Sequence, residues 1–389
     1  MILPGATLGI LGGGQLGRMF VMAARSMGYS VVVLDPEAGC PAAQLADRHI
    51  QASYTDAAAL EQLAQACVAI TTEFENVPAA ALEVLAKQRP VRPAAFALAI
   101  AQDRIREKTF LQTHGFDTAA FAAITQRDAL PAALQQVAVP ALLKTSRAGY
   151  DGKGQCWVDT LAEAEQAFDD FGAEACVLEA GIEIQVEISV LIARGMDGQV
   201  VAYPPSENRH RHGVLDISIV PARVGAEISA RATQVAQRIA ELMDYCGVLA
   251  VEFFIAKDGR LLVNEVAPRP HNSGHYTLDA CCTSQFEQQV RTLCGLPLGD
   301  ASLLSPAVMV NLLGDLWRAQ QAPPWEHVLD KPRAKLHLYG KRDARPGRKM
   351  GHFTYLGASV EEALSQALAI QKALTSDDTI AVQAHAECR

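Results

Sequence analysis

Three features are absent from this sequence of 389 residues, and each absence excludes a class of protein. No apolar run approaches the ~18–20 residues needed to cross a bilayer, and no charged-then-apolar leader opens the chain, so we expect an unexported cytoplasmic protein with no membrane partner. Basic residues are not in excess: 34 Lys and Arg stand against 43 Asp and Glu, a net charge of −9. This balance argues against a nucleic-acid partner, which would need a basic face.

Cysteines with metal-binding spacing are also absent. Nine cysteines are scattered at positions 40, 67, 156, 176, 246, 281, 282, 294 and 388, with no CxxC pair. In a chain of this length they are typical of buried thiols in a reducing cytoplasm rather than a disulfide framework or a zinc site. A nucleophilic role for Cys281 is an alternative that the pattern does not favour.

The length predicts two or three domains, because single hydrophobic cores stop growing near ~250–300 residues. Half of the residues are hydrophobic, which is enough for a large core. Arg-Pro pairs at 89–90 and 92–93 interrupt the pattern, and Pro297, Pro306, Pro323 and Pro324 punctuate the chain after residue 295. We therefore predict domains over 1–92, 93–295 and 296–389, with a flap subdomain at about 115–183 inside the second.

Residues 248–275 carry the most informative pattern in the chain. Two β-rich runs flank Asp258-Gly259, and Asp-Gly between apolar runs is typical of a two-residue hairpin turn. That turn would pair Lys257 with Arg260 and would place Glu252 directly opposite Glu265, with Cβ atoms about 5 Å apart.

Two carboxylates facing each other across a hairpin repel, and both faces of this hairpin read as buried. Leu261, Val263 and Glu265 would share one face, with the alternate residues on the other. Burying two carboxylates costs several kcal/mol each unless a cation lies between them. A hard divalent cation such as Mg²⁺, completed by nucleotide phosphates, would resolve the conflict. The alternative is that an Arg or a backbone donor satisfies each carboxylate separately.

A glycine-rich turn follows the first apolar run, residues 7–11. Glycines at 12, 14 and 17 match GxGxxG and precede a helix-like segment to about Met27, and a second strand, Val31–Leu34, ends at Asp35. Taken alone, this unit favours NAD binding with Asp35 on the ribose. Two alternatives are open: backbone N–H groups that bind another anion, or a tight turn with no ligand.

A third strand, Val68–Thr72, ends in Glu73-Phe74-Glu75-Asn76. Carboxylates at the carboxyl end of a parallel strand lie where open α/β sheets bind ligands. Alternatively, Glu73 caps the helix predicted over Pro78–Lys87.

Helices are predicted at 94–101 and 103–114, and a glycine-rich loop at 146–155 lies between the strands Ala141–Thr145 and Cys156–Val158. Three glycines, two cations and a hydroxyl in such a loop favour a flap that folds over phosphates, although a mobile surface hairpin is the alternative. On the second helix Arg104 and Lys108 share a face at i,i+4 spacing, as either solvated charges or ligand contacts.

Further elements are read from polar and amphipathic patterns. Residues 206–212 form a polar loop with two histidines, too sparse in ligands for a metal site. Apolar residues between Glu227 and Tyr245 recur at helical spacing, so a helix that ends at Gly247 should pack against the hairpin. Five cations within 340–349, between the predicted strands Lys335–Tyr339 and Met350–Tyr355, are either a solvated loop or a receptor for a phosphate.

Taken in chain order, these motifs resemble the ATP-grasp ligases. The segment Ala267-Pro268-Arg269-Pro270-His271-Asn272-Ser273-Gly274-His275 is similar to the N5-carboxyaminoimidazole ribonucleotide synthetases of purine biosynthesis, as are GGGQLGRM, EFENV and GYDGKGQ. Many ATP-grasp enzymes carry a metal-ligating Asn where this chain has Ala267, and the synthetase family shares the Ala. The resemblance runs from about residue 7 to 355.

The resemblance implies an α/β fold: an ATP-grasp fold preceded by a Rossmann-like parallel-sheet domain and followed by a small β-rich C-terminal domain. It implies an enzyme that carboxylates 5-aminoimidazole ribonucleotide with ATP and bicarbonate through carboxyphosphate, using Mg²⁺ or alternatively Mn²⁺ and no biotin. It also implies a homodimer. Rival functions are another ATP-grasp ligase such as formate-dependent glycinamide ribonucleotide formyltransferase, an NAD-dependent oxidoreductase, and a non-catalytic nucleotide sensor.

The resemblance also implies four groups of site residues. Metal ligands would be Glu252 and Glu265, and catalytic contacts Tyr150, Asp151, Lys153 and Arg269. Nucleotide contacts would be Arg104, Lys144, Gly149, Gly152, Gly154, Gln155, Glu179, Ile182, Glu187, His210, Asn264 and Glu265. Substrate contacts would be Gly14, Gln15, Leu16, Glu73, Asn76, Arg147, Asn272, Ser273, His275, Lys341 and Arg348.

Overall fold

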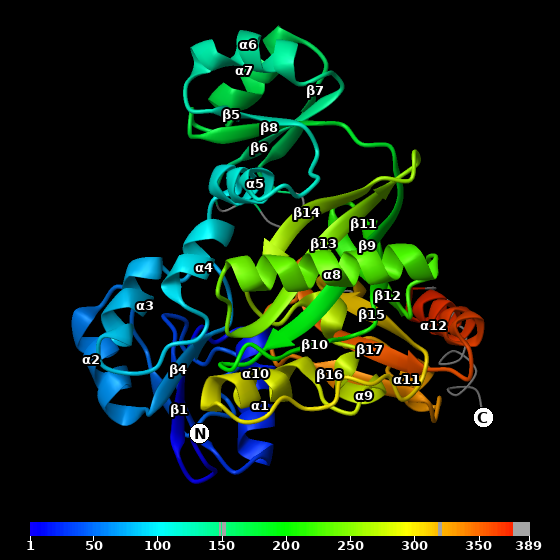
Figure 1. Cartoon of the computed structure of the whole chain (residues 1–389). Coiled ribbons are helices and arrows are strands. Elements are labelled where there is room, and N and C mark those ends of the chain that lie inside the picture. The colour runs from blue at the N-terminus through cyan, green and yellow to red at the C-terminus, as the bar shows by residue number, and fades with distance from the viewer. Residues whose placement is uncertain (148, 150–152, 318–320, 376–389) are drawn as a thin grey trace.

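The computed structural model describes residues 1–147, 149, 153–317 and 321–375 (Figure 1). Its first part is a parallel sheet of strand order β3-β2-β1-β4. Helices cover both faces, α1 and α10 on one and α2 to α4 on the other, so that four of the five residues of β1 (TLGIL) are buried. The elements are β1 (Thr7–Leu11), α1 (Gln15–Ser26), β2 (Ser30–Leu34), β3 (Arg48–Ile50), α2 (Ala57–Ala66), β4 (Ala69–Thr72), α3 (Ala79–Ala86) and α4 (Ala95–Ala101).

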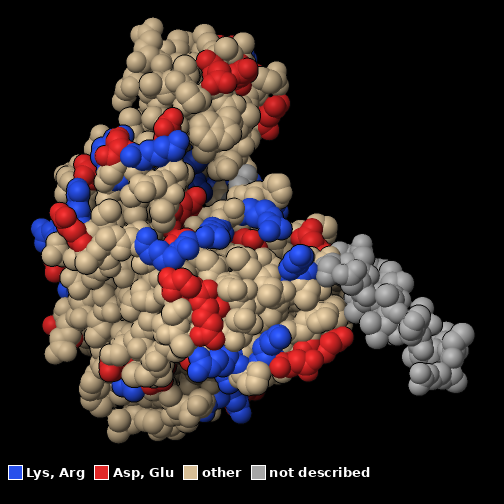
Figure 2. Space-filling model, turned by 90° about the vertical axis from the view of Figure 1, so that its right-hand side faces the viewer, with Lys and Arg blue, Asp and Glu red and all other residues tan. Residues whose placement is uncertain are grey.

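Helix α5 (Arg104–Thr113) leads into a separate lobe, which stands above the rest of the molecule in Figures 1 and 2. This flap lobe is an antiparallel sheet of order β5-β8-β6-β7 with two helices on one side. Its elements are β5 (Phe121–Ile124), α6 (Leu130–Gln136), β6 (Ala141–Thr145), β7 (Gln155–Val158), α7 (Leu161–Asp170) and β8 (Cys176–Ala180).

A nine-stranded sheet forms the centre of the molecule, with path β14-β13-β9-β11-β12-β15-β17-β16 and β10 paired to β9. Its first elements are β9 (Ile184–Arg194), β10 (Val200–Ala202), β11 (Ser206–Arg211), β12 (Val214–Val220), α8 (Ala226–Leu242), β13 (Gly247–Ala256), β14 (Leu261–Ala267), α9 (Thr277–Ala280) and α10 (Gln285–Cys294). The C-terminal elements are β15 (Ala307–Leu313), α11 (Glu326–Leu329), β16 (Ala334–Leu338), β17 (Lys349–Leu356) and α12 (Val360–Thr375). Because β12 pairs with β15, the C-terminal strands extend the central sheet.

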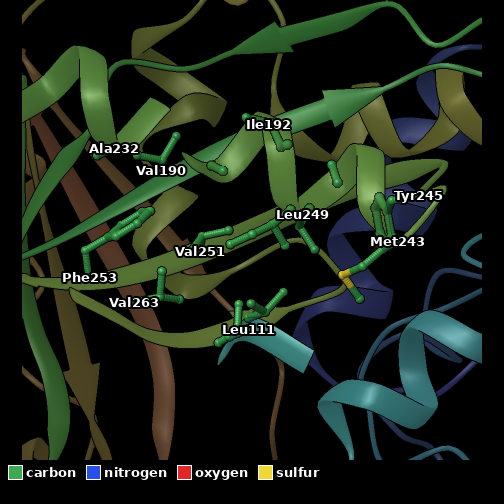
Figure 3. Close-up of a cluster of buried hydrophobic side chains, with 14 of the residues drawn as sticks. Leu111, Val190, Ile192, Ala232, Met243, Tyr245, Leu249, Val251, Phe253 and Val263 are labelled. Carbon is green, nitrogen blue, oxygen red and sulfur yellow. The ribbon is translucent and has the colours of Figure 1, made fainter. Parts of the chain in front are cut away.

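The core that supports the hairpin lies between α8 and strands β9, β13 and β14 (Figure 3). Ala232, Ala236 and Ile239 of α8 are fully buried there. The helix predicted between Glu227 and Tyr245 is therefore confirmed, as is its packing against the hairpin. Its predicted end is wrong: α8 ends at Leu242, and Gly247 is the first residue of β13.

Two further predictions about local structure are wrong. The polar segment at 206–212 is not a loop, because Ser206–Arg211 is strand β11 in the middle of the central sheet. The turn between β13 and β14 contains three residues rather than two, since the Ala256 amide donates to the carbonyl of Arg260 and Gly259 has a φ of +85°. A glycine at that position is expected for a three-residue hairpin loop.

Two features of the structure concern nucleic-acid and membrane partners. On the face drawn in Figure 2, Lys and Arg side chains alternate with Asp and Glu and do not form one continuous basic surface. Within the described ranges, no helix has the length and apolar character that a membrane crossing requires.

Candidate functional site

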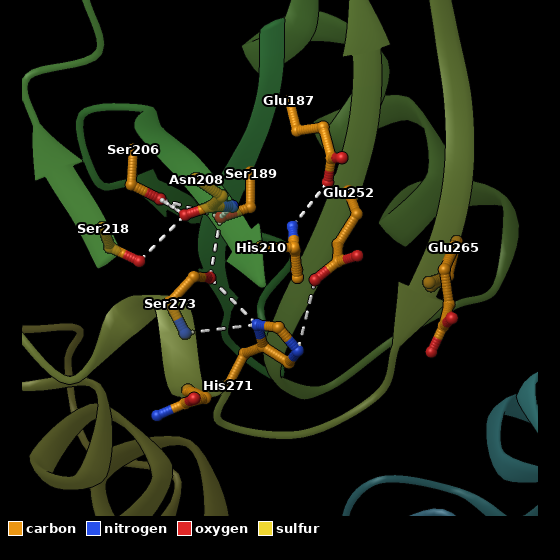
Figure 4. A network of polar contacts seen from close by, with 12 residues as sticks. Glu187, Ser189, Ser206, Asn208, His210, Ser218, Glu252, Glu265, His271 and Ser273 are labelled. Carbon is orange, nitrogen blue, oxygen red and sulfur yellow. Dashed lines mark hydrogen bonds and ion pairs between the residues drawn. The ribbon is translucent and has the colours of Figure 1, made fainter. Parts of the chain in front are cut away.

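The paired carboxylates of the hairpin are the centre of the site. Glu252 on β13 is the register partner of Glu265 on β14, as predicted (Figure 4). The three-residue turn shifts the register by one residue, so that Phe253 pairs with Val263. A second shift between Glu252 and Phe253 leaves Asn264 as an extra residue and restores the pairing of Glu252 with Glu265.

This β-bulge also corrects the predicted faces of β14. Leu261 and Val263 are buried in the core beneath α8, as is Phe253, the residue next to Glu252. Neighbouring residues on a strand point to opposite faces, so Glu252 and Glu265 lie on the face away from that core. The bulge thus puts Leu261 and Val263 on the core face of β14 and Glu265 on the opposite face.

The two carboxylates have different partners. Glu265 lies 3.3 Å from Nη1 of Arg104. Glu252 lies 3.4 Å from Nε2 of His271, and burial, followed by the charge of Arg269, lowers the pKa of His271 well below its ordinary value, so this imidazole is neutral. Burial and then the charge of Glu265 raise the pKa of Glu252 to about 7. Among the described residues, Arg104 thus gives Glu265 a cationic partner, whereas Glu252 contacts an imidazole.

Such a donor set fits a hard divalent cation. The described residues contain no group of three or more His, Cys, Asp or Glu that could hold a metal ion. Two carboxylates on one sheet face would therefore supply part of a coordination shell, with phosphate and water oxygens completing it, as Mg²⁺ prefers.

Helix α5 brings three charged side chains to the hairpin and the flap lobe. Asp103 caps the helix, and Arg104 donates to the carbonyl of Gly149 at 3.2 Å as well as pairing with Glu265. Glu107 accepts a hydrogen bond from the Val266 amide at 2.6 Å, and burial, with the nearby charge of Glu265, raises the pKa of Glu107 to about 8. Sequence reasoning missed Glu107, although its i+3 spacing from Arg104 places it on the same helix face.

A buried triad lies beside this helix. The Nζ atoms of Lys144 and Lys108 lie 3.1 and 3.2 Å from the same oxygen, Oε2 of Glu179. Burial alone would raise the pKa of Glu179, but the two lysines hold it below its usual value. Two cations and one carboxylate leave a net positive charge where the resemblance implies nucleotide phosphates.

On the other side of the hairpin, Glu187 of β9 lies 2.7 Å from Nδ1 of His210 on β11. Burial alone would lower the pKa of His210, but the hydrogen bond to Glu187 raises it above its usual value. Ile182 and Asn264, also implied as nucleotide contacts, are partly exposed.

The N–H groups of the glycine turn are held by carboxylates of the chain itself. Glu73 accepts from the amides of Gly14 and Gly17, at 2.8 and 2.5 Å, and therefore does not cap α3. Asp35 accepts from the Gly13 amide at 2.7 Å and from the Tyr54 hydroxyl at 2.6 Å. An Asp35 that is buried and used in this way counts against the NAD interpretation, in which it would bind a ribose. Gln15 and Leu16 begin α1 immediately after this turn.

The predicted catalytic residue Arg269 follows β14 and pairs with a carboxylate from the first domain. Its Nε and Nη2 donate to the two carboxylate oxygens of Glu75, the second of these bonds measuring 3.0 Å. Sequence reasoning did not find this partner, although Glu75 is two residues from Glu73 in the same motif. Asn76, the next residue, is exposed.

The loop after Arg269 turns its polar side chains inward. Ser273 accepts from the Ser189 hydroxyl at 2.7 Å and lies 2.9 Å from Nδ1 of His271, in a network that joins Glu252 to the buried Asn208 (Figure 4). Asn272 exchanges hydrogen bonds with Asn311, and His275 contacts Gln285. The predicted substrate residues Asn272, Ser273 and His275 are buried and support the loop in this structure.

The basic segment 340–349 lies against the first domain. Gln44 donates to the carbonyl of Gly340 at 2.9 Å, and the charge of Lys341 acts on Glu73 of the glycine turn. Arg348 is partly buried, and its Nη1 donates to the carbonyl of Asp343 at 3.0 Å. The fold thus brings the glycine turn and the basic segment together, although they lie near opposite ends of the sequence.

The glycine-rich flap is described in part. Tyr150, Asp151 and Gly152 lie outside the described residues. Arg147 pairs with Asp103 at 3.1 Å, and the carbonyl of Gly154 accepts from the Thr145 amide. Gly149 is placed by its bond to Arg104, while Lys153 is exposed and Gln155 begins β7.

Three family models match the chain in order. They are the ribonucleotide synthetase preATP-grasp domain over residues 5–102, the ATP-grasp domain over 109–286 and the phosphoribosylaminoimidazole carboxylase C-terminal domain over 307–366. The N5-carboxyaminoimidazole ribonucleotide synthase of Bacillus subtilis is 44% identical over 366 residues, which cover 94% of this chain and 95% of the relative. The chain belongs to this family of synthases. The Brucella melitensis synthase is 46% identical, covering 90% of this chain and 96% of its own length.

Solved structures agree with this assignment. The synthetase from Thermus thermophilus has a TM-score of 0.88 at 41% identity, covering 95% of this chain and 99% of that one. The synthase from Aspergillus clavatus, solved with ADP and 5-aminoimidazole ribonucleotide, has a TM-score of 0.87 at 30% identity, covering 95% of this chain and 98% of that one. The predicted fold class and enzyme class are confirmed: the chain is an ATP-grasp ligase of purine biosynthesis.

Proposed function

We propose that this chain uses ATP and bicarbonate to carboxylate the exocyclic amine of 5-aminoimidazole ribonucleotide, through carboxyphosphate, giving N5-carboxyaminoimidazole ribonucleotide, ADP and phosphate. The observation that carries the proposal is the Glu252–Glu265 pair on the site face of the hairpin, beside Arg104 and Arg269. Family membership supports the identity of the acceptor.

The nucleotide would lie between the flap lobe and the hairpin. Lys144 and Arg104 bring positive charge to this space, and Glu179 and Glu187 bound it on either side. Mg²⁺ held by Glu252 and Glu265, with Mn²⁺ as a substitute, would neutralise charge on the nucleotide phosphates. Gly149, Gly154, Gln155, Ile182, His210 and Asn264 complete the nucleotide contacts that we propose, together with Gly152 outside the described residues.

The ribonucleotide would lie between the glycine turn and the basic segment 340–349. Lys341 and Arg348 would bind its phosphate, because a guanidinium suits bidentate contact with phosphate oxygens. Glu73 would contact the sugar or the base while it holds the turn. The remaining substrate contacts that we propose are Gly14, Gln15, Leu16, Asn76, Arg147, Asn272, Ser273 and His275.

Catalysis by this site would consist mainly of positioning the substrates and stabilising charge. Arg269 and Lys153 would stabilise negative charge that spreads over the transferring phosphoryl group and the carboxyphosphate. Tyr150 and Asp151 would face the acceptor. Closure of the 146–155 flap would exclude water, which otherwise hydrolyses carboxyphosphate.

We further propose that the enzyme is a cytoplasmic homodimer. The eight described cysteines are all free thiols, as expected in a reducing compartment. Sedimentation equilibrium of the purified chain tests the assembly, and a single species at the monomer mass of 41.7 kDa would contradict it.

One coupled assay tests the proposed reaction. ADP release should depend on both bicarbonate and 5-aminoimidazole ribonucleotide, and formate with glycinamide ribonucleotide should not replace them. ADP release that needs formate would identify the formyltransferase, and ATP binding without turnover would identify a nucleotide sensor.

A further inference from the structure

The loop after β4, residues 73–77, lies between the two halves of the site. Its first carboxylate, Glu73, holds the amides of the glycine turn at Gly14 and Gly17. Its second, Glu75, pairs with Arg269, which follows β14 of the hairpin. Two residues of one loop thus contact the proposed ribonucleotide half and the proposed nucleotide half.

The contact between Glu75 and Arg269 is bidentate and shielded from solvent. Both oxygens of Glu75 accept from the guanidinium, and the side chains are 21% and 14% exposed. Two parallel bonds fix the plane of a guanidinium as well as its position. Although burial opposes the charge on Arg269, Glu75 and then Glu265 and Glu252 raise its pKa, which places the guanidinium within the field of the hairpin carboxylates.

The loop is itself fixed, so Glu75 has little freedom to move. The amide Nε2 of Gln102, the residue after α4, donates to the carbonyls of Glu75 and Val77 at 2.5 and 2.6 Å. Nη1 of Arg269 donates to the carbonyl of Pro270 at 3.2 Å. Three of the five N–H groups of Arg269 therefore donate hydrogen bonds to described residues. One N–H group on Nη1 and one on Nη2 have no acceptor among these residues.

We propose that Glu75 is a positioning residue, which fixes the guanidinium of Arg269 so that its two remaining N–H groups meet the anion formed between the two substrates. Glu75 itself contacts no reacting atom. Because the same loop holds the glycine turn, it sets the distance between the ribonucleotide and the charge-stabilising arginine. This inference rests on the proposed function, in which Arg269 stabilises that anion.

The test compares E75Q with E207Q. Glu207 and Arg223 form an equally bidentate ion pair, between β11 and the segment after β12. E75Q should lower kcat by about tenfold to a hundredfold, a range expected when a charged group is misplaced, while the KM for ATP stays within about twofold. E207Q should leave kcat within about twofold even if both variants lose similar thermal stability.

A double-mutant cycle separates positioning from mere structure. If Glu75 acts through Arg269, E75Q/R269A should have the kcat of R269A alone, because the group being positioned is already gone. E75D, which keeps the charge one methylene further back, should recover part of the lost kcat and decides the matter if E75Q does not fold.

Three results would overturn the inference: multiplicative effects on kcat in the double variant, an equal fall in kcat for E207Q, or wild-type kcat in E75Q and E75D. A wild-type chain that releases no ADP with bicarbonate and the aminoimidazole would instead overturn the proposed function. The two failures are therefore distinguishable in one set of assays.

Discussion

At the hairpin, the carboxylates have partners from different segments of the chain, and Glu252 contacts an imidazole rather than a guanidinium or a backbone amide. Arg104 of α5 pairs with Glu265, Arg269 pairs with Glu75, and Glu107 accepts a backbone amide. Glu252 contacts the neutral His271, and burial, followed by the charge of Glu265, raises the pKa of Glu252 to about 7. A cation held between Glu252 and Glu265 would offset their repulsion, which fits their proposed role as metal ligands.

Replacing Glu265 should therefore remove catalysis and leave folding intact. We expect E265Q to lower ATP turnover by at least about a hundredfold, since it removes one charge that would hold the metal and nucleotide in place. Its melting temperature should not fall, because the substitution relieves repulsion with Glu252. Steady-state ADP release and thermal melting measure both effects. E183Q is the control, because it removes the same charge from an exposed carboxylate, and it should turn over normally. Near-normal turnover of E265Q would refute the role of Glu265.

The carboxylate of Glu73 should make the free protein less stable as the pH rises. Burial raises the pKa of Glu73 from 4.5 to about 7 even though two backbone amides oppose the shift. The folded state thus binds this proton more tightly than the unfolded state. Ionisation of Glu73 therefore does not lower the free energy of unfolding below about pH 4.5, lowers it increasingly through about pH 7, and lowers it by up to about 3 kcal/mol above that pH.

The substitution E73Q isolates this effect. Between about pH 5 and pH 8 the melting temperature of the wild-type chain should fall more steeply than that of E73Q, which has no proton to lose there. Parallel melting curves across this range would mean that Glu73 has an ordinary pKa.

At the scale of elements, two local features decide where the site residues point. The hairpin turn is one residue longer than Asp-Gly predicts, and the β-bulge at Asn264 compensates for it, so Glu252 still faces Glu265. Sequence alternation predicted the pair and could not predict the bulge, because which strand carries an extra residue depends on packing beneath α8. Strand β11 was missed for a related reason: its pairing with β9 and β12 outweighs a local sequence of polar residues.

The basic segment between β16 and β17 gives the prediction at this scale. R348A should raise the KM for the aminoimidazole ribonucleotide at least about tenfold and leave the KM for ATP nearly unchanged, because a phosphate would lose a charged, bidentate partner. R345A, an exposed cation of the same segment, is the matched control. Equal effects of R348A on both KM values would remove Arg348 from the phosphate site.

At the scale of the whole molecule, the site exists because distant segments meet. The order of the domains and the motifs within them could be predicted from the sequence, since each motif is local. The contacts of Glu75 with Arg269, Glu107 with the Val266 amide and the basic segment with the first domain could not, because the partners in each contact are at least 159 residues apart in the sequence. The continuity of β12 with β15 was likewise invisible, because strand pairing between domains leaves no local pattern.

The central claim is that magnesium-bound nucleotide makes the Glu252–Glu265 pair tolerable, and a crystal structure of the chain with Mg²⁺ and a non-hydrolysable ATP analogue tests it directly. We predict a cation in contact with both carboxylates at about 2.1 Å, bridged to phosphate oxygens. A structure in which the two carboxylates stand apart, or in which only protein cations such as Arg104 neutralise them, would contradict the account.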